Sequence, residues 1–221
     1  MRCFLFFSVM IYSFLLRGQE EESSYKEDQF FLSASYLNVR HDIPEFTQFG
    51  FSHSFQLGYI NDISLSSNGQ RALGIGLGYG YDYIISNLTV ENSIDASVFS
   101  LTSSTMLSSK NRLSRHYITL PVEFRWRTST LEQHDFWRIY GGYKLNYQFL
   151  NRIDPFYGRP KNIKNNITPF QHSLSLAMGY DTWNIYFEYG FSSFFSKSTR
   201  TQEDVPLELS ALKFGLIFYL L

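Results

Sequence analysis

The sequence predicts an all-β fold, an eight-stranded antiparallel up-and-down transmembrane β-barrel. Three observations favour it: apolar and polar residues alternate with a period of two, the connections between the alternating segments are long and short in turn, and tryptophans recur at one end of those segments. Aromatic residues make up 19% of the chain and charged residues 18%. This is more aromatic and less charged than a soluble domain of this size needs.

Residues 1–18 are predicted to be a secretory signal peptide. Arg2 precedes an apolar run over residues 3–16, and this run is shorter than the roughly 20 residues that a membrane-spanning helix needs. We place the cleavage site after Gly18. The alternative is an uncleaved anchor or a buried strand.

The mature chain is then predicted to begin with a flexible tail at residues 19–28, which are charged and polar. The barrel domain follows at residues 29–221. Cys3 is the only cysteine and lies inside the signal peptide. The mature protein would therefore contain no disulfide, thiol catalyst or cysteine metal site.

The clearest alternation lies between Arg71 and Tyr83. Leucine, isoleucine and tyrosine occupy one face there, and four glycines and Asp82 occupy the other, a separation that a strand produces and a helix does not. Glycine weakens a soluble strand, but inside a narrow barrel it would leave room for large side chains of other strands. The other predicted strands are residues 29–39, 51–59, 117–127, 137–149, 172–180, 183–191 and 211–221.

A soluble β-sandwich also alternates, with its apolar face turned inward, so the lengths of the connections are needed to distinguish the two. Bacterial outer-membrane barrels have short periplasmic turns and longer outer loops. The odd-numbered connections are predicted at residues 40–50, 85–115, 151–170 and 193–207, and the even-numbered ones at 61–70, 129–135 and 181–182. The odd ones are long and the even ones short, except for an intermediate 61–70, which favours the membrane barrel.

Aromatic residues on the apolar face are predicted to form two girdles at the membrane interfaces, where a ring is buried while its N–H or O–H stays wet. The predicted girdle residues are Trp126, Trp137 and Trp183 at the periplasmic end and Tyr83, Tyr147 and Tyr189 at the outer end. The alternative is that these rings form the core of a soluble β protein.

Residues 116–137 read HYITLPVEFRWRTSTLEQHDFW and continue as RIYGGYKLNY, and the chain ends in LKFGLIFYLL. With these segments, of which LPVEFRWRTST is the most specific, the chain resembles the PorT-like outer-membrane β-barrel proteins of Bacteroidota, often called porin-family proteins. The resemblance extends over about residues 29–221. It implies an eight-stranded barrel in the bacterial outer membrane and, as an alternative function, accessory service in type IX secretion or envelope assembly.

The polar faces of the strands place charged residues inside the predicted barrel. These lumen residues are Asp82, Glu123, Arg125, Arg127, Arg138, Lys144, Glu188 and Lys213. Eight strands enclose only enough space for side chains, and charges there must be paired or hydrated. We expect cross-strand pairs among Glu123, Arg125, Arg138 and Lys144, and between Glu188 and Lys213, forming a structural plug. The alternative is a polar conduit or a ligand pocket.

Neither catalysis nor a cofactor is expected. The histidines lack the spacing of a metal site, and no G-x-S-x-G sequence occurs. Ser52, His53 and His172 lie near the predicted outer rim, so a lipid-modifying enzyme is an alternative. A narrow porin is another.

The expected function is therefore a structural or interaction-type outer-membrane barrel. Outer-membrane lipid and lipopolysaccharide are its expected partners, together with other envelope or secretion proteins. Nucleic acid is not an expected partner, because no basic patch occurs in the sequence. The serine- and threonine-rich loop at residues 87–115, in which residues 96–106 alternate and predict an extended hairpin, and the basic loop at residues 155–164 are the candidate binding surfaces.

Overall fold

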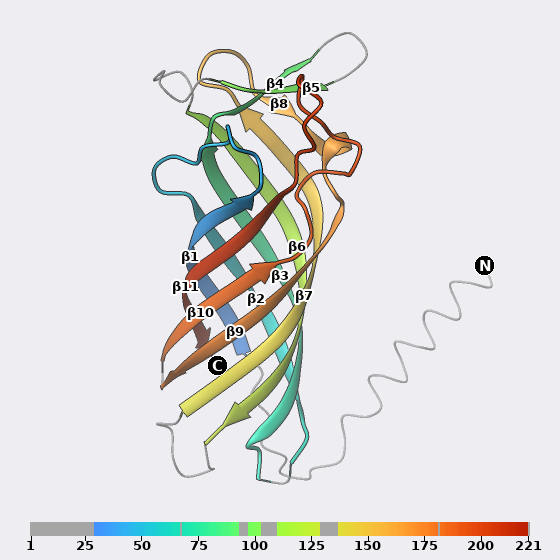
Figure 1. Cartoon of the computed structure of the whole chain (residues 1–221). Coiled ribbons are helices and arrows are strands. Elements are labelled where there is room, and N and C mark those ends of the chain that lie inside the picture. Colours follow the sequence, from blue (N-terminus) through green and yellow to red (C-terminus); the bar gives the residue numbers. More distant parts are fainter. Residues whose placement is uncertain are drawn as a thin grey trace, which may run out of the picture.

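The computed structural model describes residues 29–66, 68–92, 97–102, 110–128, 137–180 and 182–220. Eight of its strands form a closed antiparallel barrel (Figure 1). These are β1 (Gln29–His41), β2 (His53–Ser64), β3 (Arg71–Ser86), β6 (Asn111–Arg127), β7 (Trp137–Asp154), β9 (Phe170–Tyr180), β10 (Trp183–Gly190) and β11 (Leu209–Leu220). Each strand pairs with the next along the chain, and β1 pairs with β11. The predicted fold class is confirmed; the predicted signal peptide and tail lie outside the described residues.

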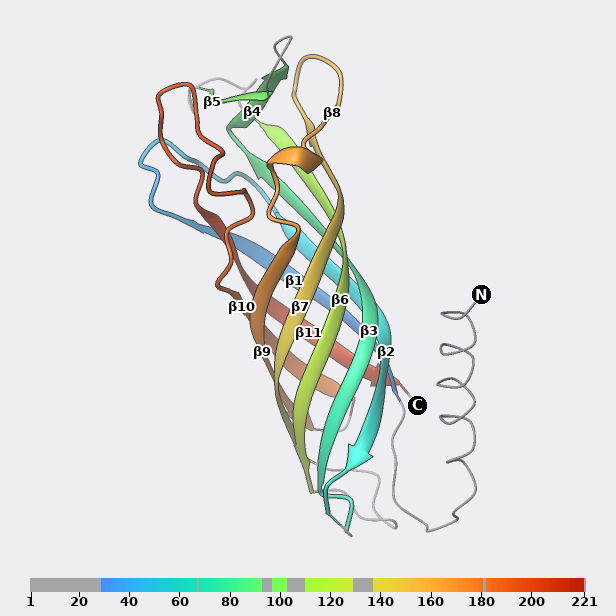
Figure 2. The ribbon, with the colours of Figure 1, turned by 90° about the vertical axis from the view of Figure 1, so that its right-hand side faces the viewer.

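The two ends of the barrel differ in their connections. One end, called the turn end below, carries the start of β1, the end of β11 and the short connections; the other, the loop end, carries the four long ones (Figure 2). The loop end also holds the two-stranded sheet of β4 (Leu88–Asn92) and β5 (Ser97–Leu101), the short strand β8 (Lys161–Asn162) and a 3-10 turn at Lys164–Asn166. The second strand of the two-stranded sheet, β5, lies within the residues 96–106 whose alternation predicted a hairpin, whereas its first strand, β4, precedes them; residues 96 and 103–106 lie outside the described residues.

Side chains alternate between a polar lumen and an apolar outer wall. On β11, Phe214 is 60% exposed on the outer wall while its neighbour Lys213 is 2% exposed in the lumen. The same alternation in β1 buries Phe31, Ser33 and Ser35, which settles a strand register that the sequence left open.

Glycines in the lumen make room for side chains of other strands, as expected. A Cβ built on Gly78 of β3 would lie 2.7 Å from the ring of Phe31, which belongs to β1. No ordinary packing allows that distance, so the absence of a side chain at position 78 is what admits the Phe31 ring.

The loop end is closed by an apolar cluster, called the loop cap below, which the sequence analysis did not predict. Its members are Leu37, Val39, Ile43, Phe46, Ile84, Leu88, Val90, Phe99, Leu113, Ile153, Ile163, Ile167, Phe194, Phe195, Leu207, Leu209 and Ala211. They come from the parts of the strands nearest the loop end and from all four long connections. The loops are therefore packed onto the barrel mouth by apolar burial.

Within the described parts of the chain, no helix is long and apolar enough to cross a bilayer.

Candidate functional site

All eight residues predicted to face the lumen do so, and none is more than 6% exposed. Two further charged residues, Asp62 and Arg115, are buried with them. Because the eight lie on the inward side of alternating strands, the alternation alone was enough to find them. Nine of the ten residues form two networks, one toward the turn end and one at the centre of the barrel, and the guanidinium of Arg138 lies 5.9 Å from the centre of the Tyr219 ring.

The turn-end network is built around Asp62 of β2. Its two carboxylate oxygens accept hydrogen bonds from Nη1 of Arg125, at 2.5 Å, and Nη1 of Arg127, at 2.9 Å. Arg125 also contacts Glu123, at 3.2 Å, and its guanidinium lies 4.7 Å from the centre of the Tyr140 ring. Each buried charge thus meets an opposite charge or an aromatic face, as burial requires.

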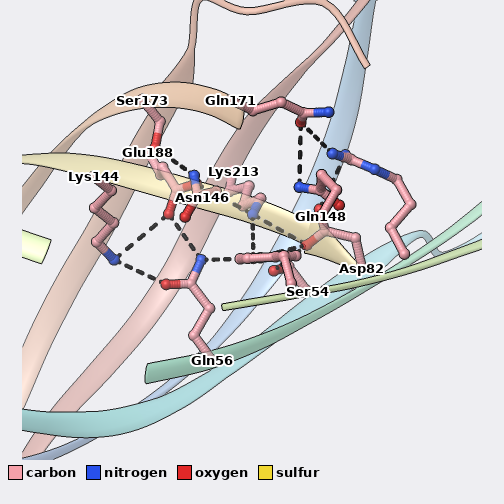
Figure 3. A network of polar contacts seen from close by, with 12 residues as sticks. Ser54, Gln56, Asp82, Lys144, Asn146, Gln148, Gln171, Ser173, Glu188 and Lys213 are labelled. Carbon is pink, nitrogen blue, oxygen red and sulfur yellow. Dashed lines mark hydrogen bonds and ion pairs between the residues drawn. The ribbon is translucent and has the colours of Figure 1, made fainter. Parts of the chain in front are cut away.

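The central network is a chain of ion pairs (Figure 3). Lys213 Nζ lies between Asp82 at 3.1 Å and Glu188 at 3.2 Å; Arg115 reaches Asp82 at 3.2 Å, and Lys144 reaches Glu188 at 3.6 Å. The expected contact of Glu188 with Lys213 is present. Lys144, however, contacts a carboxylate two strands away instead of one on β6, because its side chain extends into the lumen and not along the wall.

Neutral side chains complete this network and fill the lumen. Gln56 donates to Glu188 at 2.8 Å and accepts from Lys144 at 2.8 Å. The Tyr117 hydroxyl accepts from Lys213 at 2.8 Å. The cavity left beside these groups is about 20 Å³, which holds about one water molecule. The arrangement is that of a plug, with no room for a solute.

The charges of the plug do not cancel. Among the described residues with buried charges, six are basic and four acidic, which leaves an excess of two positive charges. Among all the residues that the structure describes, no three His, Cys, Asp or Glu side chains gather as a metal site would require. The plug is held together by hydrogen bonds and ion pairs.

The six predicted girdle residues all face outward. Trp137 and Trp183 are 60% and 65% exposed at the turn end, where they pack on Tyr180 and Phe218 respectively, each pair with ring centres 5.4 Å apart. Trp126 lies beside them on β6, and Tyr83, Tyr147 and Tyr189 lie on the half of the wall nearer the loop end.

The residues considered for lipid chemistry are not brought together. Ser52 is buried, and its Oγ accepts the backbone N–H of Ile85 at 3.1 Å. His53 stacks on Tyr83 at the outer wall, with ring centres 5.0 Å apart. His172 lies on β9, with three strands between it and β2. This set therefore forms no nucleophile and base pair.

The long connections form a pocket of about 310 Å³ at the loop end, called the loop pocket below. Ile43, Leu101 and Val205 line it with apolar atoms, and Glu45 and Glu203 add exposed carboxylates. Its walls come from the connections after β1, β3 and β10, which the sequence does not place together.

Backbone contacts hold the loop pocket in shape. Phe99 and Thr201 form an isolated parallel bridge, and the N–H of Gln202 donates to the carbonyl of Phe99 at 2.9 Å. The Phe99 side chain belongs to the loop cap, where its ring packs edge-on against Phe195 with centres 5.3 Å apart. The pocket is thus anchored in the apolar cluster beneath it.

Comparison with protein families matches residues 18–196 to the family described as outer membrane protein beta-barrel domain. The matched segment includes seven of the eight barrel strands and ends in the connection between β10 and β11. A search of curated proteins finds no match.

Proposed function

We propose that this chain, which belongs to the outer membrane protein β-barrel domain family, acts as a closed barrel whose cell-surface loops bind a partner. The observation that carries the proposal is the loop cap, which fixes all four long connections on the barrel mouth. Ordered loops on a rigid scaffold bind with a smaller loss of conformational entropy than mobile ones. The proposal assigns the chain no catalytic step.

The filled lumen supports binding over transport. The centre of the barrel is bridged by Lys144, Glu188 and Lys213. The loop cap lies between these residues and the loop end. A solute would have to separate buried ion pairs and displace the cap, which costs several kcal/mol for each unpaired charge. We therefore expect no conductance when the purified full-length protein is placed in a planar bilayer.

The loop pocket is the surface that we propose for the partner. Its volume of about 310 Å³ lies in the range of sites that hold small ligands or single side chains. The apolar lining favours a hydrophobic group, and Glu45 and Glu203 favour a cation next to it. A lysine or arginine beside an aliphatic or aromatic side chain has this chemistry.

Site-specific photo-crosslinking on living cells tests the proposal. A photoreactive residue at Glu203 should give a discrete adduct, and the same residue at Trp183, on the outer wall at the turn end, should not. If the two positions gave the same products, or if Glu203 gave none, the loop pocket would have no role as a binding surface.

Accessory service in a secretion or envelope-assembly machine is a second proposal, supported by the resemblance of residues 116–147 to PorT-like proteins. Affinity purification of the full chain from membranes should then recover stoichiometric periplasmic or outer-membrane components. Recovery of the barrel alone, from membranes in which the machine is intact, would count against this role.

Export by the segment 1–18 is also proposed. Cleavage after Gly18 predicts a mature protein that begins at Gln19 and lacks cysteine. Intact mass measurement of the protein from outer membranes tests this directly, because an uncleaved anchor would keep the mass of the full chain.

A further inference from the structure

A basic face lies on one side of the barrel at the loop end, where β6 pairs with β7 and β8 pairs with the end of β7 (Figure 2). Arg112 of β6 and Arg152 of β7 are both exposed there on the outer wall. Arg112 lies opposite Asp154 and Arg152 lies opposite Ser114, so the two arginines are two residues apart in the register of the strand pair. This face shares no residue with the loop pocket.

Basic residues outnumber acidic ones on this face. Within the part of the chain that the structure describes, Arg112 has no ion pair, and Arg152 contacts Asp154 through Nε at 3.0 Å. That contact leaves the two Nη groups of Arg152 for a further acceptor. The connection after β7 adds three basic residues and no acidic one, namely Arg159, Lys161 and Lys164. An anion is therefore the ligand that this face attracts.

An aromatic cluster on the turn-end side of the arginines marks the height of the membrane interface. Three rings have their centres 4.8–6.3 Å from that of His116 on β6; they belong to Tyr79, Tyr81 and Phe149. The Tyr79 hydroxyl and Nδ1 of His116 are hydrogen-bonded at 2.6 Å. Rings with polar tips favour the boundary between lipid and water. Arg112, four residues beyond His116 toward the loop end, therefore lies in the headgroup layer.

The wall on the turn-end side of this cluster is apolar. Ile118, Leu120 and Val122 follow on β6 and are exposed, and acyl chains cover a wall of this kind in an outer-membrane barrel. The loop end is the outer end in the orientation that the termini and the short turns predict, and lipopolysaccharide is the lipid expected in that leaflet. A lipopolysaccharide molecule whose acyl chains lie on this wall would present its phosphates to the arginines.

We propose that this basic face binds the phosphorylated glucosamine headgroup of lipopolysaccharide. Arg112 and the Nη groups of Arg152 donate to its phosphate oxygens, which guanidinium groups bind in a bidentate geometry. A phosphate monoester carries nearly two negative charges and three strong acceptor oxygens, whereas the phosphodiester of a phospholipid carries a single charge. Two neighbouring arginines therefore favour the monoester. The proposal depends on the outward orientation of the loop end and is independent of the partner proposed for the loop pocket.

Lipid retention by the full-length protein tests the site. The protein is reconstituted in phosphatidylcholine vesicles that contain equal amounts of phosphatidylglycerol, dephosphorylated lipid A and diphosphoryl lipid A, the membrane anchor of lipopolysaccharide. It is then extracted in mild detergent, and bound lipid is counted by native mass spectrometry. We expect about tenfold greater retention of diphosphoryl lipid A than of the other two, the usual effect of one charge-assisted contact.

Arg112→Gln should lower this retention by about tenfold, and the double variant Arg112→Gln, Arg152→Gln should lower it further. Arg40→Gln is the matched control, because Arg40 is also an exposed arginine near the loop end but lies on β1, with β2 and β3 between it and β6. Two exposed carboxylates, Asp42 and Glu208, line the same cavity as Arg40 and weaken its attraction for an anion. This variant should retain diphosphoryl lipid A as the unmodified protein does.

Equal retention of the dephosphorylated form or of phosphatidylglycerol would overturn the proposal, and so would equal losses in the Arg112 and Arg40 variants. Heat-modifiable migration on gels confirms that each variant is folded. If Arg112→Gln did not fold, the lipid competition with the unmodified protein and the single variant Arg152→Gln would still decide. The crosslink from Glu203 in the loop pocket should be the same in the Arg112 variant, so failure of this site and failure of the proposed function give different results.

Discussion

The ring of Tyr117 occupies the space in which Gly80 would carry a side chain. A Cβ built on Gly80 would lie 2.1 Å from the ring. The ring cannot swing away easily, because its hydroxyl contacts Lys213 at 2.8 Å and Asp82 at 3.2 Å. Gly80 of β3 and the large Tyr117 of β6 are therefore a matched pair.

Gly80→Ala is predicted to destabilise the barrel by about 1–3 kcal/mol or more, because it forces Tyr117 out of its network. Urea unfolding of the refolded protein in detergent micelles measures this. Gly141→Ala is the control, since a Cβ at Gly141 has nothing within 4 Å, and it should be neutral. In a Tyr117→Ala background the cost of Gly80→Ala should largely vanish; an unchanged cost would contradict the pairing.

The same strand pair shows why part of the lumen could be predicted and part could not. Strict alternation in β3 and β6 identifies Asp82, Glu123 and Arg125, because a single rule assigns every side chain to a face. Arg115 was missed although it follows the same alternation as Tyr117 and Thr119, because the predicted strand began at Tyr117 and residues 85–115 were assigned to a connection. The alternation therefore finds a lumen residue only where the strand has been given its full length.

Asp62 was missed for the same reason. The pattern in the sequence indicated an end of the strand near Tyr59, and residues 61–70 were assigned to a connection, but β2 continues to Ser64. The loop cap was missed because Phe46, Phe99 and Phe194 are far apart in the sequence and have no shared period. Only the closed barrel brings them together, so no local pattern could predict that contact.

Asp62→Asn is predicted to cost about 3–5 kcal/mol, because it removes the carboxylate shared by Arg125 and Arg127 and leaves their charges buried. Urea unfolding in micelles again provides the measurement. Asp204→Asn is the same chemical change in an exposed pair with Arg200, for which less than about 1 kcal/mol is expected. Similar costs for the two variants would show that the turn-end network does not stabilise the fold.

Phe195→Ala is predicted to loosen the loops and leave the barrel intact. Phe195 is 1% exposed and packs edge-on against Phe99, so its loss opens a cavity in the loop cap. Removal of a buried phenylalanine costs about 3–5 kcal/mol, which falls on the loops because the strand pairs below are untouched. Limited proteolysis of the protein in vesicles should cut the loops faster, with heat-modifiable migration unchanged.

Phe156→Ala is the control for this variant, because Phe156 lies in the connection after β7 and is largely exposed. It should leave the rate of proteolysis unchanged. Equal rates for the Phe195 variant and the unmodified protein would mean that the loop cap does not restrain the loops.

The loop end is predicted to face the cell exterior and the turn end the periplasm, because bacterial barrels place their termini and short turns in the periplasm. Single cysteines can test this, since Cys3 is the only native one and precedes the predicted cleavage site. Tyr157→Cys, at a loop residue 78% exposed, should react with a membrane-impermeant maleimide on intact cells. Asn68→Cys, in the connection between β2 and β3, should react only after the outer membrane is permeabilised, and Leu77→Cys on the apolar wall should resist the reagent throughout. Labelling of Asn68→Cys on intact cells, with Tyr157→Cys protected, would place the loop pocket in the periplasm, where it would meet an entirely different set of partners.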